Sequence, residues 1–328
     1  MKFVISDEQR ALAEAIDQVI EGAGGTGIAR TWAVGELVPG QELWSQLAEL
    51  GLFGLCVDET EGGMGGTPVD LVVAFERLGY HAVPGPYLES AALLPDLVDP
   101  TIRAGLVDGS VIATAAVPGL LTYALDSAVS THSYIVNPDS ICPARAGNPM
   151  DSIDETRTLS ELHAADSAVT RDPQLVATAI DRATLCCAAV LLGAGERLLH
   201  EAIEYAKIRR QFDRAIGEYQ ALKHQLADVR VALTFARPLI NGAALDLGKP
   251  VGPRSVSAAK VAAGDAALLA ARIALQVHGA IGYTQEHDLS LWITRVHALL
   301  GAWGTARYHR NRVASFILAP VAQLAPSV

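Results

Sequence analysis

Long Ala- and Leu-rich stretches with a helical period fill the second half of this 328-residue chain. From Pro173 onward, apolar residues recur every three or four positions, and only short segments that contain Gly or Pro interrupt the pattern. The pattern predicts helices over residues 174–209, 218–247, 254–279, 288–302 and 305–318. This half of the chain is therefore predicted to be α-helical.

The first part of the chain, up to about residue 105, is also predicted to be helical. Ser6 is placed to cap a helix over residues 6–21, because its side chain can accept a hydrogen bond from the backbone amide near Gln9. The helical pattern continues through Trp44 as far as the glycine-rich segment 61–66, which breaks it. Further helices are predicted over residues 69–78 and 88–97.

The middle of the chain has a different pattern. Between residues 111 and 169, β-branched runs such as 133–136 indicate short strands. The segment 137–151 is rich in Pro and Gly, and we interpret it as loop. These changes divide the chain into an N-terminal α-helical domain, a reduced middle β domain and a C-terminal helical bundle, over residues 1–108, 109–172 and 173–328.

Composition and charge exclude several classes of protein. Hydrophobic residues make up 50% of the chain and charged residues 19%, against roughly 25% charged residues in typical soluble domains. The low charge indicates surface that is buried against partner subunits. A net charge of −11 repels phosphate backbones and anionic lipids, so we expect neither nucleic acid nor a membrane as a partner.

Cysteine usage and the N-terminus bear on location. The four cysteines form no CxxC spacing, so neither a disulfide framework nor a zinc site is predicted, and we expect no bound metal. This usage is typical of the reducing cytoplasm. The N-terminal residues include charges, and no window of about 18 residues is uninterruptedly apolar, so we expect a cytoplasmic chain without a targeting signal.

Three short segments contain residues suited to bind a ligand. Arg209 precedes Gln220 by eleven residues, and a corner between them could direct a guanidinium and an amide at one anionic group. The glycines of segment 276–283 would let the backbone approach a flat or phosphorylated ligand, and segment 301–306 holds a Trp between glycines. Taken singly, the segments are better explained as a helix-end charge, a glycine cap and core or interface packing.

Taken together and in order, these segments resemble motifs of the acyl-CoA dehydrogenase family. Residues 205–220 look like the family's YAxxRxQFGxPIxxxQ sequence, with Asp213 and Ala215 in place of the usual Gly and Pro. Residues 276–283 are similar to QxxGGxGY, with Ala for the second Gly. Residues 286–292 resemble the EHDLHLY form of actinobacterial members that degrade sterol side chains and rings.

The resemblance covers nearly the whole chain, since residues 44–51 and 61–66 look like the family's W..L...G and YGG.G stretches. It implies an acyl-CoA dehydrogenase-like fold that is mainly α, with an N-terminal helical domain, a shortened middle β segment and a C-terminal four-helix bundle. The middle segment departs from the family, because it offers no clear counterpart of the TEPxxGSD and WITN strands that contact the flavin ring.

Family members use a glutamate to remove the α-proton of an acyl-CoA thioester while FAD takes the β-hydride. Aligned without gaps from Gly282, this chain has Trp303 where that glutamate usually lies. The other position that the family uses, counted back from Phe212, holds Ala183. Neither side chain can accept a proton, so the resemblance implies no catalytic residue in this chain.

By contrast, residues that resemble the FAD-binding residues of the family are retained. In the family, several of them reach across the dimer to the partner's FAD. The resemblance assigns cofactor-binding roles to Arg209, Gln211, Phe212, Gln220, Gln276, Val277, His278, Gly279 and Thr305.

These features predict a non-catalytic subunit of a heteromeric, FAD-dependent acyl-CoA dehydrogenase, similar to the α2β2 enzymes of bacterial steroid catabolism. The chain would complete the FAD site of a catalytic partner subunit, which binds the acyl-CoA, and electron-transfer flavoprotein is a further partner to consider. Two alternatives stay open: a self-sufficient dehydrogenase whose base is Glu286 or Asp288, and a structural or regulatory homologue that binds no flavin. The sequence does not identify the acyl-CoA or the partner.

Overall fold

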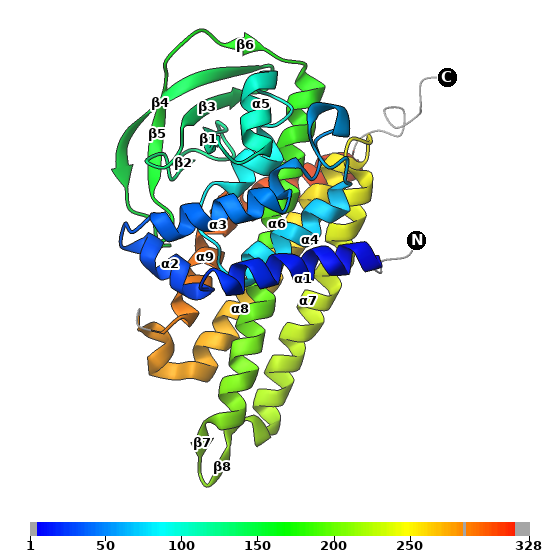
Figure 1. The fold of residues 1–328 in the computed structure, drawn as a ribbon. Coiled ribbons are helices and arrows are strands. Elements are labelled where there is room, and N and C mark those ends of the chain that lie inside the picture. Colours follow the sequence, from blue (N-terminus) through cyan, green and yellow to red (C-terminus); the bar gives the residue numbers. More distant parts are fainter. Residues whose placement is uncertain (1–4, 285–286, 319–328) are drawn as a thin grey trace.

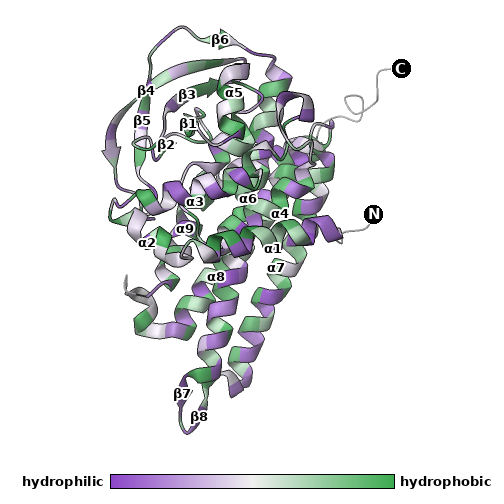
Figure 2. Ribbon diagram, viewed as in Figure 1, coloured by the Kyte–Doolittle hydropathy of each residue, from purple (hydrophilic) through white to green (hydrophobic). Residues whose placement is uncertain are grey.

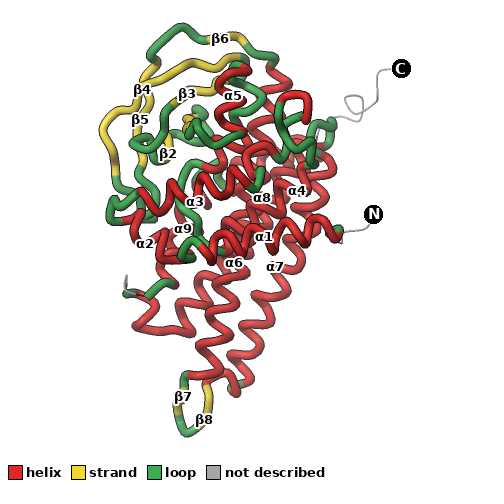
Figure 3. The backbone as a smooth tube through the Cα atoms, in the orientation of Figure 1, coloured by secondary structure: helices red, strands yellow, loops and turns green. Residues whose placement is uncertain are grey.

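The computed structural model describes residues 5–284 and 287–318, and helices dominate it (Figure 1). The strands of a six-stranded sheet gather at one end of the molecule, a short two-stranded hairpin lies at the opposite end, and helices fill the rest (Figure 3). The predicted class, mainly α with a β segment between two helical parts, is confirmed.

The N-terminal part is helical, as predicted. Its helices are α1 (Asp7–Gly22), α2 (Thr26–Ala33), α3 (Val38–Glu49), α4 (Pro68–Tyr80) and α5 (Pro100–Val107). The predicted cap of α1 is confirmed: the Gln9 amide donates to Ser6 Oγ at 3.2 Å, and the Ser6 amide donates to Gln9 Oε1 at 2.9 Å. This reciprocal pair fixes the first turn of the chain's first helix.

Two details of this part were not predicted correctly. Helices α2 and α5 were not predicted, because eight residues are too few to show an apolar period. The helix predicted over 88–97 begins where expected but is of another type and is shorter: the chain forms a π-helical turn, η3 (Leu88–Leu93). Single π-turns are rare in proteins and frequently lie at functional sites. The short 3₁₀ turns η1 (Leu52–Gly54) and η2 (Glu59–Glu61) connect α3 to α4.

The middle segment forms one small sheet. Its strands are β1 (Ala113–Ala116), β2 (Ala124–Leu125), β3 (His132–Asn137), β4 (Ser140–Met150), β5 (Leu159–Ala164) and β6 (Val169–Thr170). The strand order is β1-β3-β4-β5-β2, with β6 paired to β4. Strands β1 and β3 are parallel, and the remaining pairs are antiparallel.

The interpretation of residues 137–151 as loop is wrong, because β4 runs through them. This strand is 11 residues long, and it pairs with β3 on one side and β5 on the other. The register with β5 shifts between Ala146 and Pro149, so the irregularity accommodates the residues that break a regular ladder. Pro143 still takes part through its carbonyl, which accepts from the Ala165 amide at 2.9 Å.

The C-terminal part consists of long helices around α6 (Pro173–Ile208). After α6 come the hairpin β7 (Arg210–Gln211) and β8 (Arg214–Ala215) and the 3₁₀ turn η4 (Ile216–Glu218). The remaining elements are α7 (Gln220–Asp246), α8 (Gly252–His278), η5 (Gly279–Tyr283), α9 (Leu289–Gly301) and α10 (Ala306–Leu318). Helix α6 runs from the sheet to the hairpin, which lies at the opposite end of the molecule (Figure 1).

Helix α6 is the central element of the core. Within the described ranges it is the helix long and apolar enough to cross a membrane, but 78% of its most apolar window is buried inside the protein. Hydrophobic residues concentrate where the helices face one another (Figure 2). Helix α4 crosses α6 so closely that a Cβ added at Gly193 would lie 1.9 Å from the Glu76 carbonyl oxygen. Glycine is required there because the two backbones touch.

Candidate functional site

A groove of about 570 Å³ lies where the C-terminal end of α6, the β7–β8 hairpin, the start of α7 and the end of α8 meet. Six of the nine residues predicted to bind the cofactor line it. They are Arg209, Gln211, Gln276, Val277, His278 and Gly279. The fold thus brings together Arg209 and Gly279, which are 70 positions apart in the sequence.

Arg209 ends α6 and supplies an exposed positive charge to the groove. Its backbone is held from both sides, because its amide donates to the Tyr205 carbonyl at 2.9 Å and its own carbonyl accepts from the Ile216 amide at 2.8 Å. Among the described residues, none forms a hydrogen bond or ion pair with its guanidinium. The donors of this side chain are therefore available to an anionic ligand.

The hairpin beside Arg209 turns tightly at Phe212 and Asp213, which have φ angles of 51° and 63°. Two consecutive residues with positive φ are typical of a two-residue hairpin turn. Asp213 occupies a conformation that glycine adopts more easily, and the Arg210 guanidinium supports the turn by donating to the Asp213 carbonyl at 2.8 Å. Arg214 lies over the Tyr219 ring, 3.8 Å from its centroid.

Two stacked rings form the opposite wall. The Tyr205 and His278 rings lie 4.3 Å apart at an angle of 27°, and the His287 ring meets His278 edge-on at 5.1 Å. His278 Nδ1 donates to the Ala274 carbonyl at 2.8 Å, which leaves Nε2 as an acceptor in the neutral ring. Burial lowers the pKa of His278, so the ring is neutral at pH 7.

Gly279 ends α8 with φ 63° and ψ −137°. This is a region that residues with a side chain adopt only under strain, and an added Cβ would meet no atom within 4 Å. The glycine is therefore required by the backbone path and leaves open space beside the rings. In combination, the groove offers a free guanidinium, the amides of Gln211 and Gln276, and a flat aromatic wall. This donor set fits a ligand that carries both an anionic group and a planar ring.

Three predicted cofactor residues do not line the groove. Phe212 is 88% exposed at the tip of the hairpin, and Gln220 is exposed at the first position of α7. Thr305 lies at the start of α10, where its Oγ1 accepts from the Tyr308 amide at 3.2 Å. The structure gives Thr305 a helix-capping contact, and no contact with the groove.

Both positions that the resemblance identified for a catalytic base are closed and apolar. Ala183 and Trp303 have no exposed surface. Trp303 has a φ of 58°, and the next amide, of Gly304, donates to the Leu120 carbonyl at 3.1 Å. The indole Nε1 has no hydrogen-bond partner within residues 5–284 and 287–318, so Trp303 occupies its site as a space-filling ring.

Asp288 and Glu286 are the two carboxylates predicted as alternative bases. Asp288 is half exposed; it pairs with Arg30 Nε at 3.1 Å and accepts from Thr26 Oγ1 at 3.0 Å. It therefore ties α2 to the start of α9. Glu286 lies outside the described residues. The described residues contain no group of three or more His, Cys, Asp or Glu side chains that could hold a metal ion.

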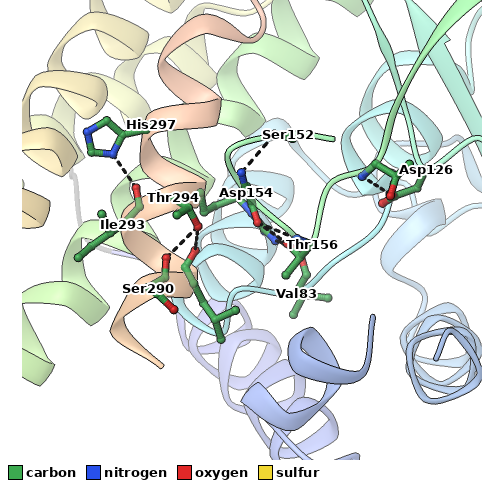
Figure 4. A network of polar contacts seen from close by, with 12 residues as sticks. Val83, Asp126, Ser152, Asp154, Thr156, Ser290, Ile293, Thr294 and His297 are labelled. Atoms are coloured by element: carbon green, nitrogen blue, oxygen red, sulfur yellow. Dashed lines mark hydrogen bonds and ion pairs between the residues drawn. The ribbon is translucent and has the colours of Figure 1, made fainter. Parts of the chain in front are cut away.

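Sequence reasoning missed a buried polar network between the sheet and α9 (Figure 4). Arg295 pairs with Asp154 and also donates to the Val83 carbonyl at 3.0 Å. Asp154 Oδ1 accepts from the Thr156 hydroxyl at 2.7 Å, and the adjacent Arg157 is 7% exposed. Burial opposes ionisation of Asp154, but Arg295 and Arg157 outweigh it and lower its pKa. The signal was the charged run 154–157 inside a segment interpreted as β.

Glu89, in the π-helical turn, lies within electrostatic range of Arg157 but makes no hydrogen bond to this network. Glu89 is 1% exposed, and neither carboxyl oxygen has a hydrogen-bond partner among the residues that the structure describes. Burial raises its pKa to about 7, although Arg157 lowers it in part. Nothing in the sequence distinguishes Glu89 from a solvated helix charge, because only the wide turn directs it inward.

Comparison with known proteins identifies relatives for most of the chain. The sequence model "Acyl-CoA dehydrogenase, N-terminal domain" matches residues 6–94, and "Acyl-CoA dehydrogenase, C-terminal domain" matches residues 174–318. Acyl-CoA dehydrogenase IpdE2 of Mycobacterium tuberculosis is 30% identical over 311 residues, which span 89% of this chain and 91% of the relative.

Solved structures share the fold over nearly the full length. A chain of the ChsE4-ChsE5 complex from Mycobacterium tuberculosis superposes with a TM-score of 0.85 at 21% identity, over 98% of this chain and 100% of that one. A chain of the Tcur3481-Tcur3483 steroid ACAD gives a TM-score of 0.84 at 22% identity, over 96% and 99% of the two chains. The fold predicted from the resemblance is confirmed.

Proposed function

The chain belongs to the acyl-CoA dehydrogenase family of FAD-dependent oxidoreductases, and we propose that it is a subunit without a catalytic base that completes the FAD site of a catalytic partner. The observation that carries the proposal is the contrast between two regions of the chain. The base positions Ala183 and Trp303 are fully buried and apolar. The groove around Arg209 is open and has a free positive charge.

The chemistry of the family requires a base, and this chain offers none at the two positions that the family uses. Removal of an α-proton requires a side chain that can accept it near neutral pH, and a buried carboxylate serves this purpose best. A methyl group and an indole accept no proton, so the partner subunit must supply the base. Trp303 excludes both water and substrate from the corresponding volume of this chain.

The groove residues fit the part of FAD that contains the pyrophosphate. When FAD is bound, its flavin ring supplies the hydride acceptor. Arg209 would pair with the pyrophosphate, because its guanidinium is free and its backbone is fixed. Gln211 and Gln276 would donate to polar groups of the same ligand, and the Tyr205–His278 stack would contact a ring. The chain's contribution is thus binding and orientation.

Association with another subunit is supported by the surface of α7. Three apolar side chains on one face are exposed: Val231 by 52%, Phe235 by 70% and Leu239 by 45%. Their spacing of four residues places them in one row along the helix. An apolar row of this kind is typical of an interface. We propose an α2β2 heterotetramer with a catalytic acyl-CoA dehydrogenase subunit, in line with the two-component ChsE4-ChsE5 complex that shares the fold.

The proposed substrate is a steroid-derived acyl-CoA that binds to the catalytic partner. Two observations support it: the resemblance of residues 286–292 to sterol-degrading members, and the shared fold with a steroid ACAD. We propose that the complex works in the cytoplasm and passes its electrons to an electron-transfer flavoprotein.

Co-expression tests the proposal. A tagged copy of this chain is purified with a candidate partner that has an intact glutamate, and flavin content and dye-coupled oxidation of a steroid-derived acyl-CoA are measured. We expect a yellow α2β2 complex whose turnover disappears when the partner's glutamate is replaced by Gln. A yellow, active chain without any partner would support the self-sufficient alternative, and a colourless complex would support the flavin-free one.

A further inference from the structure

A second pocket, of about 250 Å³, lies between the sheet and the end of α9. Residues 120–123 and Leu159 form its wall on the sheet side, and Ala298, Gly301 and Ala302 form the wall on the helix side. Most of this lining is apolar. None of the groove residues described above takes part in it, so the inference below does not rest on the proposed function.

Arg157 is the charged residue of this pocket. Its side chain is 7% exposed, yet the guanidinium makes no hydrogen bond or ion pair within 4 Å to any residue in the described ranges. A guanidinium has five N–H donors, and buried donors are normally satisfied. The guanidinium nitrogens of Arg157 keep some accessible surface, so these donors face the space of the pocket, where a ligand can reach them.

The backbone on both sides of Arg157 is fixed by hydrogen bonds. The Arg157 amide donates to the Asp154 carbonyl at 2.9 Å, and Asp154 Oδ1 accepts from the Thr156 hydroxyl. On the other side, the Thr158 amide donates to Asp126 Oδ1 at 3.0 Å, and the Asp126 amide donates to the Thr158 carbonyl at 2.7 Å. Arg157 is therefore positioned before any ligand arrives, which lowers the entropic cost of binding.

The acidic groups nearby do not neutralise Arg157 by direct pairing. Arg157 also borders a cavity of about 30 Å³, which has room for one or two water molecules and which Glu89 borders as well. Burial raises the pKa of Glu89 to about 7 and that of Asp126 to about 6, and Arg157 lowers both. These carboxyls therefore carry less than full charge near neutral pH.

We propose that the pocket binds a small monocarboxylate with an apolar body, and that the carboxylate pairs with the Arg157 guanidinium. A single cation at the inner wall matches a single negative charge, and a planar guanidinium matches both oxygens of a carboxylate. The apolar side chains of Leu120, Leu121 and Leu159 suit a short branched or aromatic body. The volume lies below that of pockets for drug-sized ligands, which begin at roughly 300 Å³.

Binding is tested with 4-fluorobenzoate, followed by ¹⁹F NMR titration of the purified full chain. We expect saturable binding of 4-fluorobenzoate and none of 4-fluorobenzamide, which has the same shape without the charge. Absence of saturable binding, or equal binding of the amide, overturns the proposal.

Variants of Arg157 identify the residue responsible. Arg157→Met keeps the apolar stem and removes the charge, so we expect affinity for 4-fluorobenzoate to fall roughly tenfold to a hundredfold. Arg145→Met is the matched control, since Arg145 is exposed on β4 outside the pocket.

Unchanged affinity in Arg157→Met overturns the proposal. If that variant fails to fold, Arg157→Lys decides instead. The point charge of lysine cannot pair with both carboxylate oxygens in the same geometry. Affinity that falls several-fold in Arg157→Lys supports the proposal, and unchanged affinity overturns it.

Discussion

The carbonyl oxygen of Trp303 accepts a hydrogen bond from Nε2 of His309 at 2.8 Å, and this contact fixes the protonation of the histidine ring. Because a carbonyl only accepts, Nε2 carries the proton and Nδ1 accepts from the Ser257 hydroxyl at 3.1 Å. Burial lowers the pKa of His309 to about 4, so the ring is neutral at pH 7. Two uncharged contacts therefore hold the turn that contains Trp303.

Replacement of Trp303 should affect stability more than turnover. Trp303→Phe keeps an aromatic ring and removes an indole nitrogen that has no partner, so we expect a loss of about 1–2 kcal/mol in the free energy of unfolding. Turnover of the complex should stay within about twofold of the wild type, because typical losses of a base are 10² or more. Denaturant unfolding and dye-coupled oxidation measure the two quantities. A large loss of turnover would place the active site in this chain.

The reverse substitution, Trp303→Glu, should create no second active site. The site around residue 303 has no exposed surface, and a carboxylate there would be buried without a partner. We expect the variant to lose stability and to show no turnover when the partner's glutamate is replaced by Gln. Recovery of turnover in that double variant would contradict this.

Arg209→Ala should release flavin without dissociating the complex. The substitution removes a charge-assisted contact of about 1.5–3 kcal/mol, so the affinity for FAD should fall about 10- to 150-fold. Flavin absorbance per complex and light scattering measure the two properties. Arg307→Ala, at an exposed position of α10, is the control and should keep its flavin. Unchanged flavin content in Arg209→Ala would show that Arg209 is only a charge at the end of a helix and does not bind flavin.

Glu89 should make the chain less stable as the pH rises. Its pKa is raised by burial from 4.5 to about 7, so the folded state binds a proton that the unfolded state has released between these values. The contribution is fully present below pH 4.5 and is lost as the pH rises through 7. Asp126, raised from 3.8 to about 6, acts in the same direction.

Glu89→Gln keeps the shape and removes the titration. We expect it to gain on the order of 2–3 kcal/mol relative to the wild type between pH 5 and pH 8. Urea unfolding at the two pH values measures the difference. Glu49→Gln, at an exposed position of α3, should show no such change. Equal pH dependence in Glu89→Gln and the wild type would show that Glu89 ionises freely.

The row of apolar side chains on α7 should control assembly. Alone, the chain should be poorly soluble or form a non-native oligomer, because Phe235 and its neighbours are left in water. Phe235→Glu should prevent co-purification with the partner, whereas Val169→Glu, at an exposed position of the sheet, should not. Size-exclusion chromatography with light scattering separates these outcomes. A stable monomer of the wild-type chain would argue against an obligate partner.

The sequence predicts the long helices well because each repeats its apolar period many times. It misses α2 and α5, which are only eight residues long, and it mistakes β4 for a loop because proline and glycine are tolerated where the strand is irregular. The π-turn at Leu88–Leu93 escapes prediction because a wide turn differs from an α-helix by one residue in register.

The candidate site was also predicted in part and missed in part. Arg209 and Gln276 meet in the groove as the motifs suggest, because each motif ends a predicted helix. Phe212, Gln220 and Thr305 do not line it, since a motif specifies which residues are near a site and not where each side chain points. Arg157 and Glu89 were missed because only tertiary packing brings the sheet, η3 and α9 together.

Helix α6 separates the two regions on which the proposed function depends. Ala183 and Arg209 lie on or at the end of α6, and at 1.5 Å per residue they are about 39 Å apart along its axis. This distance exceeds the range over which charges act in physiological salt, and substitutions so far apart have nearly additive effects. Mutations that filled the region around Ala183 would therefore leave the groove at Arg209 intact. A subunit could thus lose proton transfer during evolution while selection for ligand binding continued.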